Sequence, residues 1–183
     1  MSLTVEPVAT IDYAPAQPAP GQLHVVERFC NTLDEEHGRE VLHDPQALYE
    51  LLFELGLVDP GIRVTRRDLE RAHDLRDRLR SLALANNGVP TDVSLEATLT
   101  VHVSDDTAVL DAGEGDVDGA LAQLVGIVYT AMHDGSWSRL KACKRDVCHW
   151  LFYDRSRNRS AVWCSMAVCG NRTKTRNYRA RRS

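Results

Sequence analysis

The most informative stretch of this sequence spans residues 143–172 and reads CKRDVCHWLFYDRSRNRSAVWCSMAVCGNR. It holds two Cys-x₄-Cys pairs separated by 15 residues: Cys143, Cys148, Cys164 and Cys169. Two close pairs joined by a longer loop suit a single tetrahedral metal ion, because each pair supplies two thiolates from a tight turn. Four sulfurs fill the coordination shell of Zn²⁺ and leave no position for a substrate water. The spacing therefore predicts one structural Zn²⁺ per chain.

The cysteines also allow other interpretations, namely four buried thiols without a metal, disulfide bonds, or His149 as a ligand in place of one cysteine. Disulfides are the weakest of these, because they are rare in the cytosol, where we expect this chain to act. His149 adjoins Cys148 and would need a different turn to reach the metal. The fifth cysteine, Cys30, stands alone and is interpreted as a buried apolar residue, not as a nucleophile.

The residues between the two pairs predict how the site is built. Residues 149–153 have the composition of a strand, residues 154–158 that of a polar turn, and residues 160–163 that of a returning strand. Cys164 and Cys169 are five positions apart, about 140° around a regular helix, so they cannot share one helical face. We therefore expect Cys164 just before a helix, Ser165 as its N-cap and Cys169 in its first turns. This layout resembles a treble-clef finger more than a zinc ribbon.

Upstream of the cysteines, residues 22–138 predict an α+β body that is mostly helical. Asp44 and Pro45 open one helix, which Gly56 ends, and Thr65 with Asp68 forms a capping box at the start of the next. Further elements are a helix through residues 25–33, a helix from Val117 to His133, and a half-buried strand over residues 95–103 with a return strand over residues 107–110. We expect this body to fold without the finger.

The N-terminal residues differ from the body in composition. Residues 1–21 hold four of the seven prolines, which predicts an extended or disordered leader. They have neither the basic start nor the apolar run of a secretory signal. No stretch approaches the roughly 18 apolar residues of a membrane span. We expect a cytoplasmic protein with three segments: the leader (1–21), the body (22–138) and the finger with a basic C-terminal helix (139–183).

Charge is divided unevenly along the chain. Residues 139–183 carry 13 Lys and Arg against two acidic residues, or +11, whereas residues 1–138 carry nine Arg against 24 acidic residues, or −15. Basic segments of this kind usually meet phosphate backbones. The candidate nucleic-acid contacts are Arg172, Lys174, Arg176 and Arg179 on the C-terminal helix, with Arg157 and Arg159 from the turn between the cysteine pairs. The alternatives are a solvated tail that folds back on the acidic body, or a tail that binds an acidic protein.

A second cluster of arginines lies on the helix that follows Thr65. Acidic residues interleave with these arginines, so a solvated helix face is the first interpretation. Arg76 and Arg80 lie one turn apart and could hold a small anionic effector.

Two parts of the chain resemble known families. The first part consists of Cys148 to Asn158 (CHWLFYDRSRN), Trp163 to Met166 (WCSM) and Cys169 to Arg172 (CGNR). It resembles the CGNR zinc finger. The second consists of Phe29 to Thr32 (FCNT), Pro45 with Leu48 and Leu51, and Leu75-Arg76 with Leu79-Arg80. It resembles the ABATE domain, with Cys30 in place of a small aliphatic residue. The resemblance implies a bacterial, stress-related transcription regulator whose finger binds nucleic acid.

The sequence favours a zinc-dependent nucleic-acid-binding protein, with DNA favoured over RNA. The alternative is a protein-interaction module in which the finger is only a structural staple. An enzyme is disfavoured, because the sequence shows no nucleophile–base pair, phosphate loop or open metal site. A homodimer and a small anionic effector remain open.

Overall fold

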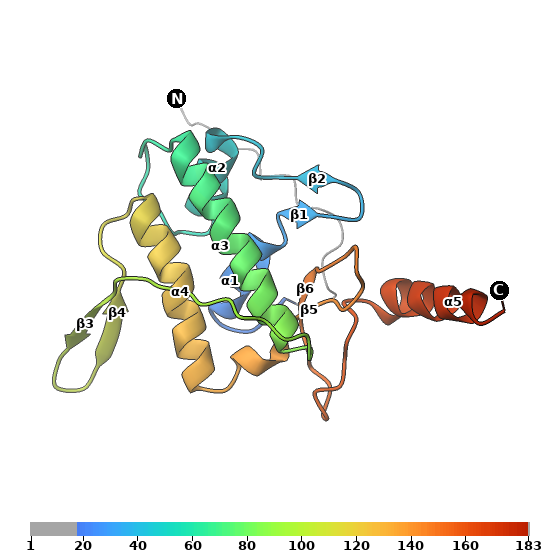
Figure 1. Ribbon diagram of the computed structural model, residues 1–183. Coiled ribbons are helices and arrows are strands. Elements are labelled where there is room, and N and C mark those ends of the chain that lie inside the picture. Colours follow the sequence, from blue (N-terminus) through green and yellow to red (C-terminus); the bar gives the residue numbers. More distant parts are fainter. Residues whose placement is uncertain (1–17, 183) are drawn as a thin grey trace.

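The computed structural model describes residues 18–182, in which helices are connected by short antiparallel strand pairs (Figure 1). The buried side chains form one main core and a smaller cluster in the finger. The helices are α1 (Leu23–Cys30), α2 (Pro45–Glu54), α3 (Arg66–Ala85), α4 (Val117–His133), the 3₁₀ turn η1 (Trp137–Arg139), the π turn η2 (Met166–Gly170) and α5 (Asn171–Ala180). The strands are β1 (Leu33–Asp34), β2 (Arg39–Glu40), β3 (Thr100–Val103), β4 (Ala108–Asp111), β5 (Leu140–Ala142) and β6 (Leu151–Tyr153). They pair as β1–β2, β3–β4 and β5–β6. The predicted α+β class, mostly helical with small strand pairs, is confirmed.

The core lies between α1, α3 and α4, with α2 packed on α3. Phe29, Leu48, Leu79 and Leu124, one from each of these helices, are fully buried. Cys30 is buried in the same core, and burial raises the pKa of its thiol to about 12. Its complete burial among apolar side chains confirms the interpretation of Cys30 as a buried apolar residue.

The helix boundaries follow the capping signals. The Asp44 carboxylate accepts a hydrogen bond from the Ala47 amide, and Thr65 and Asp68 form a reciprocal capping box. Gly56 has a φ of +69°, the left-handed conformation that glycine adopts at little cost after a helix. The first helix is shorter than predicted, because it ends at Cys30 and Leu33 starts β1 instead. The β1–β2 pair is too short to show alternation and was not predicted.

The predicted strand over residues 95–103 is only partly correct. Residues 95–99 are irregular, and β3 covers Thr100–Val103 alone. The expected half-burial is also wrong, since Val101 and Val103 are 59% and 76% exposed. Leu95 packs against the core and Leu99 lies against Gly126 of α4, so only the first part of the alternating run reaches a helix. The β3–β4 hairpin projects from one end of the molecule, and α5 projects from the other (Figure 1).

The finger's hairpin differs from the prediction. Strand β6 pairs with β5, which precedes the first cysteine pair, and not with residues 160–163. Those residues instead turn around the buried Asp154 carboxylate, which accepts hydrogen bonds from Lys141 Nζ at 2.7 Å and from the Ala161 amide at 3.0 Å. The hairpin therefore encloses the first cysteine pair, as a knuckle, and does not follow it.

The β5–β6 hairpin packs into the core of the body. Leu140 and Leu151 are fully buried in that core, and α3 contacts β5. The Asn31 side chain donates to the Leu151 carbonyl at 3.0 Å and accepts from its amide at 2.8 Å. Asn86 and Asn87 at the end of α3 donate to carbonyls of η1, β5 and residue 162. The predicted boundary near residue 138 stays a prediction, but the two sides of it share one core.

The predicted leader falls on residues 1–21, of which 1–17 lie outside the described residues. Across the described part of the chain, we find no helix that is both long enough and apolar enough to cross a bilayer.

Candidate metal centre and basic helix

The first cysteine pair lies in the turn between β5 and β6. The Cys143 amide donates to the Trp150 carbonyl at 2.9 Å, which continues the ladder, and the Cys148 amide donates to the Arg145 carbonyl at 2.9 Å, which closes the knuckle. His149 directly follows with a φ of +46°, a left-handed conformation that is uncommon for a residue with a side chain. This reversal sends the chain back into β6. Its imidazole lies 2.8 Å from a Glu35 oxygen, so the structure gives His149 a role outside the cysteine cluster.

The second pair is placed by the start of a helix. Ser165 precedes η2, and its hydroxyl accepts from the Val168 amide at 3.3 Å, as the predicted N-cap would. The π turn η2 then brings Cys169 into the cluster and continues into α5. A Cβ on Gly170 would lie 2.5 Å from the Met166 sulfur and 3.2 Å from Trp163, so glycine allows this turn to pack closely. The predicted arrangement of Cys164, Ser165 and Cys169 is confirmed.

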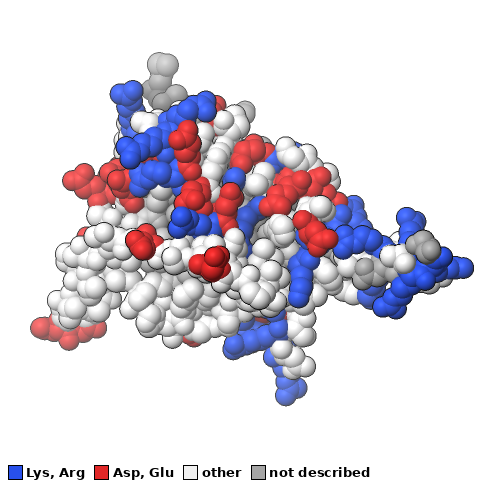
Figure 2. Space-filling view, viewed as in Figure 1, with Lys and Arg blue, Asp and Glu red and all other residues white. Residues whose placement is uncertain are grey.

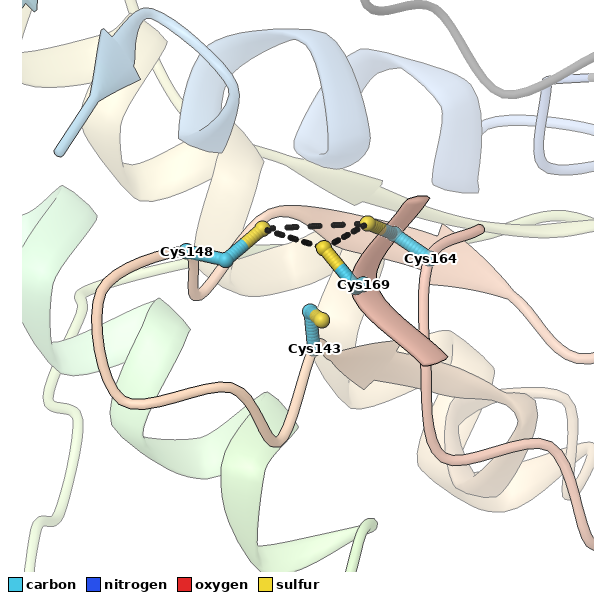
Figure 3. Close-up of side chains that lie close together, drawn as sticks. All are labelled: Cys143, Cys148, Cys164 and Cys169. Carbon is cyan, nitrogen blue, oxygen red and sulfur yellow. Dashed lines mark hydrogen bonds between the residues drawn. The ribbon is translucent and has the colours of Figure 1, made fainter. Parts of the chain in front are cut away.

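The four sulfurs converge on one point (Figure 3). Those of Cys148, Cys164 and Cys169 lie 3.7 Å from one another, and all four lie within 4.8 Å. A tetrahedron of sulfurs at the usual Zn–S distance of about 2.3 Å has edges of about 3.8 Å. The three 3.7 Å edges therefore match a zinc cage, and Cys143 completes the set of four sulfurs.

The thiol acidities are consistent with a site that needs a cation. A hydrogen bond from Cys148 lowers the pKa of Cys143, whereas separate hydrogen bonds with Cys143 raise the pKa of Cys148 and the pKa of Cys164. Four thiolates cannot form side by side without a positive charge among them. Zn²⁺ supplies that charge, and its complex with four thiolates is about −2. The four thiolates thus form a closed, structural site for one Zn²⁺.

The basic helix α5 leaves the cluster directly. Arg172, Arg176 and Arg179 lie at i, i+4 and i+7, and with Asn171 and Thr175 they line one shallow groove of about 440 Å³. Apart from Thr173, which is half-buried, the side chains described on α5 are exposed. Arg172, Arg176 and Arg179 therefore form one face, which we call the arginine stripe, of a helix that starts at the metal site.

Two family models match the chain. Residues 23–131 match ABATE, described as "Putative stress-induced transcription regulator", and residues 139–182 match the CGNR zinc finger. The chain belongs to the ABATE family. Its C-terminal module is a CGNR zinc finger, in which Cys169, Gly170, Asn171 and Arg172 are the defining residues. No curated relative matches the chain.

The basic residues predicted to contact nucleic acid lie on two different elements of the CGNR finger and have different partners. In the described structure, Arg172 pairs with Glu36, and Arg176 pairs with Asp146 at 3.1 Å. Lys174 is exposed on α5, but Arg157 and Arg159 belong to the turn after β6 and not to the helix. Arg159 has a φ of +51° and donates to the Ser138 hydroxyl at 3.0 Å. Among the described residues, the Arg172–Glu36 pair is a contact of the kind that a tail folded back on the acidic body would make.

Arg76 and Arg80 of the ABATE region have a structural role in place of the predicted anion site. Their side chains are 3% and 4% exposed. Arg76 donates to Glu40 at 2.7 Å and to Thr32 at 3.1 Å. Arg80 donates to the carbonyls of Cys30 and Leu33 and to Glu35. These bonds hold the segment between α1 and β2 on α3 and leave neither guanidinium open to an effector.

Sequence reasoning missed the acidic residues that face the finger. Glu35 and Glu36, in the loop between β1 and β2, contact His149, Arg145 and Arg172 of the CGNR finger. A hydrogen bond from His149 lowers the pKa of Glu35, and one from Arg145 lowers the pKa of Glu36. The adjacent pair Glu35-Glu36 was visible in the sequence, but nothing there placed it beside cations about 110 to 136 residues away.

Proposed function

We propose that this ABATE-family protein is a zinc-dependent nucleic-acid-binding protein that acts in transcription regulation in the cytoplasm. Helix α5 is the contact element, and Zn²⁺ fixes it to the hairpin. The observation that carries the proposal is the projection of a zinc-supported arginine helix away from the acidic body (Figure 2). The activity is binding, with no catalytic step.

The shape of α5 favours duplex DNA over RNA. Its 10 residues make a rod about 15 Å long. The major groove of B-DNA, about 12 Å wide, admits such a helix, whereas the major groove of A-form RNA is too narrow for side-chain readout. Because α5 is exposed around most of its circumference, it can enter a groove without first leaving a packed position.

Charge supports nucleic-acid binding by the finger, for DNA and RNA alike. Residues 139–183 sum to +11, and the zinc–thiolate cluster reduces this by about 2, to about +9. The aromatic side chains of residues 150–163, which could otherwise stack on bases, largely pack inside the protein. Trp150 and Phe152 are buried, as expected for a small core, and Tyr153 and Trp163 are half-buried. Apart from Tyr178 on α5, which is 59% exposed, the surface of the finger is therefore dominated by arginines and not by aromatic residues.

The test is the salt dependence of binding after the stripe is removed. Each phosphate contact contributes about −0.9 to the slope of log affinity against log salt on duplex DNA. Replacing Arg172, Arg176 and Arg179 by alanine is expected to weaken binding to all sequences and to flatten that slope by roughly 3. The readout is fluorescence anisotropy with labelled DNA and RNA duplexes over a salt series.

The matched control replaces three exposed arginines of the acidic body, Arg63, Arg66 and Arg67, and so removes equal charge. This triple variant is expected to bind DNA with nearly the affinity of the wild type. Equal affinity of both triple variants at every salt concentration would rule out the stripe as the contact surface.

A protein-interaction module is the second candidate, and the β3–β4 hairpin favours it. Val101, Val103 and Val109 are each more than half exposed there. If the zinc-loaded protein binds no nucleic acid even at low salt, this function is the one that remains, with the finger as a staple.

A further inference from the structure

The carboxylate of Glu36 contacts two arginines of the finger at once. One oxygen accepts from Arg145 in the knuckle at 2.5 Å, and the other accepts from Arg172 on α5. Arg145 follows the first zinc ligand by two residues, and Arg172 follows the last by three. We call these two contacts the Glu36 bridge. It joins the ABATE region to both halves of the CGNR finger.

The two contacts of the bridge differ in exposure. The side chains of Glu36 and Arg145 are 17% and 14% exposed, whereas that of Arg172 is 51% exposed. A largely buried arginine–carboxylate pair is costly to break, but a half-exposed pair contributes little and opens readily. Arg172 can therefore leave Glu36 while Arg145 keeps its partner.

A carboxylate that binds an arginine occupies the place where a phosphate would bind the same guanidinium. We propose that Glu36 is an internal competitor of phosphate at Arg172, so that the ABATE region sets the nucleic-acid affinity of its own finger. The inference rests on the proposed function. On binding, the backbone phosphate takes Arg172, and Glu36 retains Arg145, so the knuckle stays in place. Within the finger, Arg176 also pairs with a carboxylate, that of the exposed Asp146, at 3.1 Å.

The test is Glu36→Gln in the full-length, zinc-loaded chain. Glutamine keeps the shape and a carbonyl for Arg145 but removes the charge that attracts both arginines, of which the half-exposed Arg172 is the more readily freed. We expect DNA affinity to rise about two- to fivefold at low salt, as for the loss of one half-exposed ion pair, and the gain to shrink as salt screens that pair. The control is Glu70→Gln, which removes one exposed carboxylate of α3 and is expected to leave the affinity unchanged.

A double-mutant cycle separates the bridge from general electrostatics. In the Arg172→Ala background, Glu36→Gln is expected to give no gain, because the competed group is gone. An equal gain in that background would overturn the proposal, and so would unchanged or weaker binding of Glu36→Gln alone.

A measurement without nucleic acid keeps this proposal apart from the proposed function. Glu36→Gln is expected to speed amide hydrogen exchange in residues 171–180 while zinc content stays at one ion per chain. If exchange is faster but no variant binds DNA, the proposed function is wrong. The Glu36 bridge is then a structural contact only. Unchanged exchange would overturn the bridge itself.

Discussion

At the scale of single residues, we expect the zinc ligands to contribute more to the folding free energy of the finger than any of its other side chains. Cys148→Ser removes one of four thiolates, and structural Zn²⁺ contributes on the order of 10 kcal/mol or more to local folding. We expect this variant to lose its zinc and the order of η2 and α5, whereas the buried helices α1, α3 and α4 stay folded. Elemental analysis with circular dichroism checks both parts. Full zinc occupancy in Cys148→Ser would contradict the assignment of that ligand.

Residue identity alone predicted the ligands, because thiol pairs at this spacing have few other uses in a chain of this kind. Identity did not predict the partners of charged residues. Arg76 and Arg80 looked like surface arginines at helical spacing, yet the fold buries them against Glu40 and Glu35. Their burial depends on where the segment between α1 and β2 crosses α3, which is tertiary information that no local pattern contains.

At the scale of elements, the capping box of α3 predicts a dependence on pH. Burial by itself would raise the pKa of Asp68, but hydrogen bonds from Thr65 outweigh it and lower that pKa. A lowered pKa in the folded state means that the stabilisation is present above the unfolded pKa, near 3.9, and is lost as pH falls through the folded value. We expect Asp68→Asn to be less stable than the wild type at pH 6 and to lose less stability on acidification below about pH 4. Thermal unfolding across this range checks it, and parallel curves would contradict it.

Helices were easier to predict than strands. Helix α4 spans Val117–His133 as expected, because its caps and apolar spacing are local signals. Strand β5 was not predicted, and β6 was paired with residues 160–163 instead, because the Lys141–Asp154 contact that sets the path of residues 154–161 cannot be seen in a pattern of polar and apolar residues. The partner of β6 was therefore predicted from composition alone, and the composition of residues 160–163 also fits a strand.

At the scale of the whole molecule, the shared core predicts that body and finger are not independent. A chain ending at residue 138 loses Leu140 and Leu151, and each large buried side chain removed from a core costs about 2–5 kcal/mol. It also leaves the Asn31 amide without its two partners. We now expect this truncated chain to be strongly destabilised, in contrast to the sequence-based expectation. Calorimetry of the truncated and full-length chains decides between the two.

The control for the truncation is a pair of substitutions in the full-length chain. Leu151→Ala is expected to lower the unfolding temperature markedly, and Val103→Ala, at an exposed position of β3, is expected to change it little. If the truncated chain unfolds at the temperature of the full-length protein, the core of the body is complete without β5 and β6.

The opposite placement of α5 and the β3–β4 hairpin gives the molecule an electric polarity. Residues 81–138, which include that hairpin, carry nine acidic residues and no Lys or Arg, whereas α5 and its neighbours carry the surplus of cations (Figure 2). In the field of a polyanion such a body experiences a torque that turns the cationic end forward before any contact forms. If the protein binds nucleic acid as we propose, the finger is expected to meet the polyanion first, and the acidic hairpin at the opposite end is expected to face solvent.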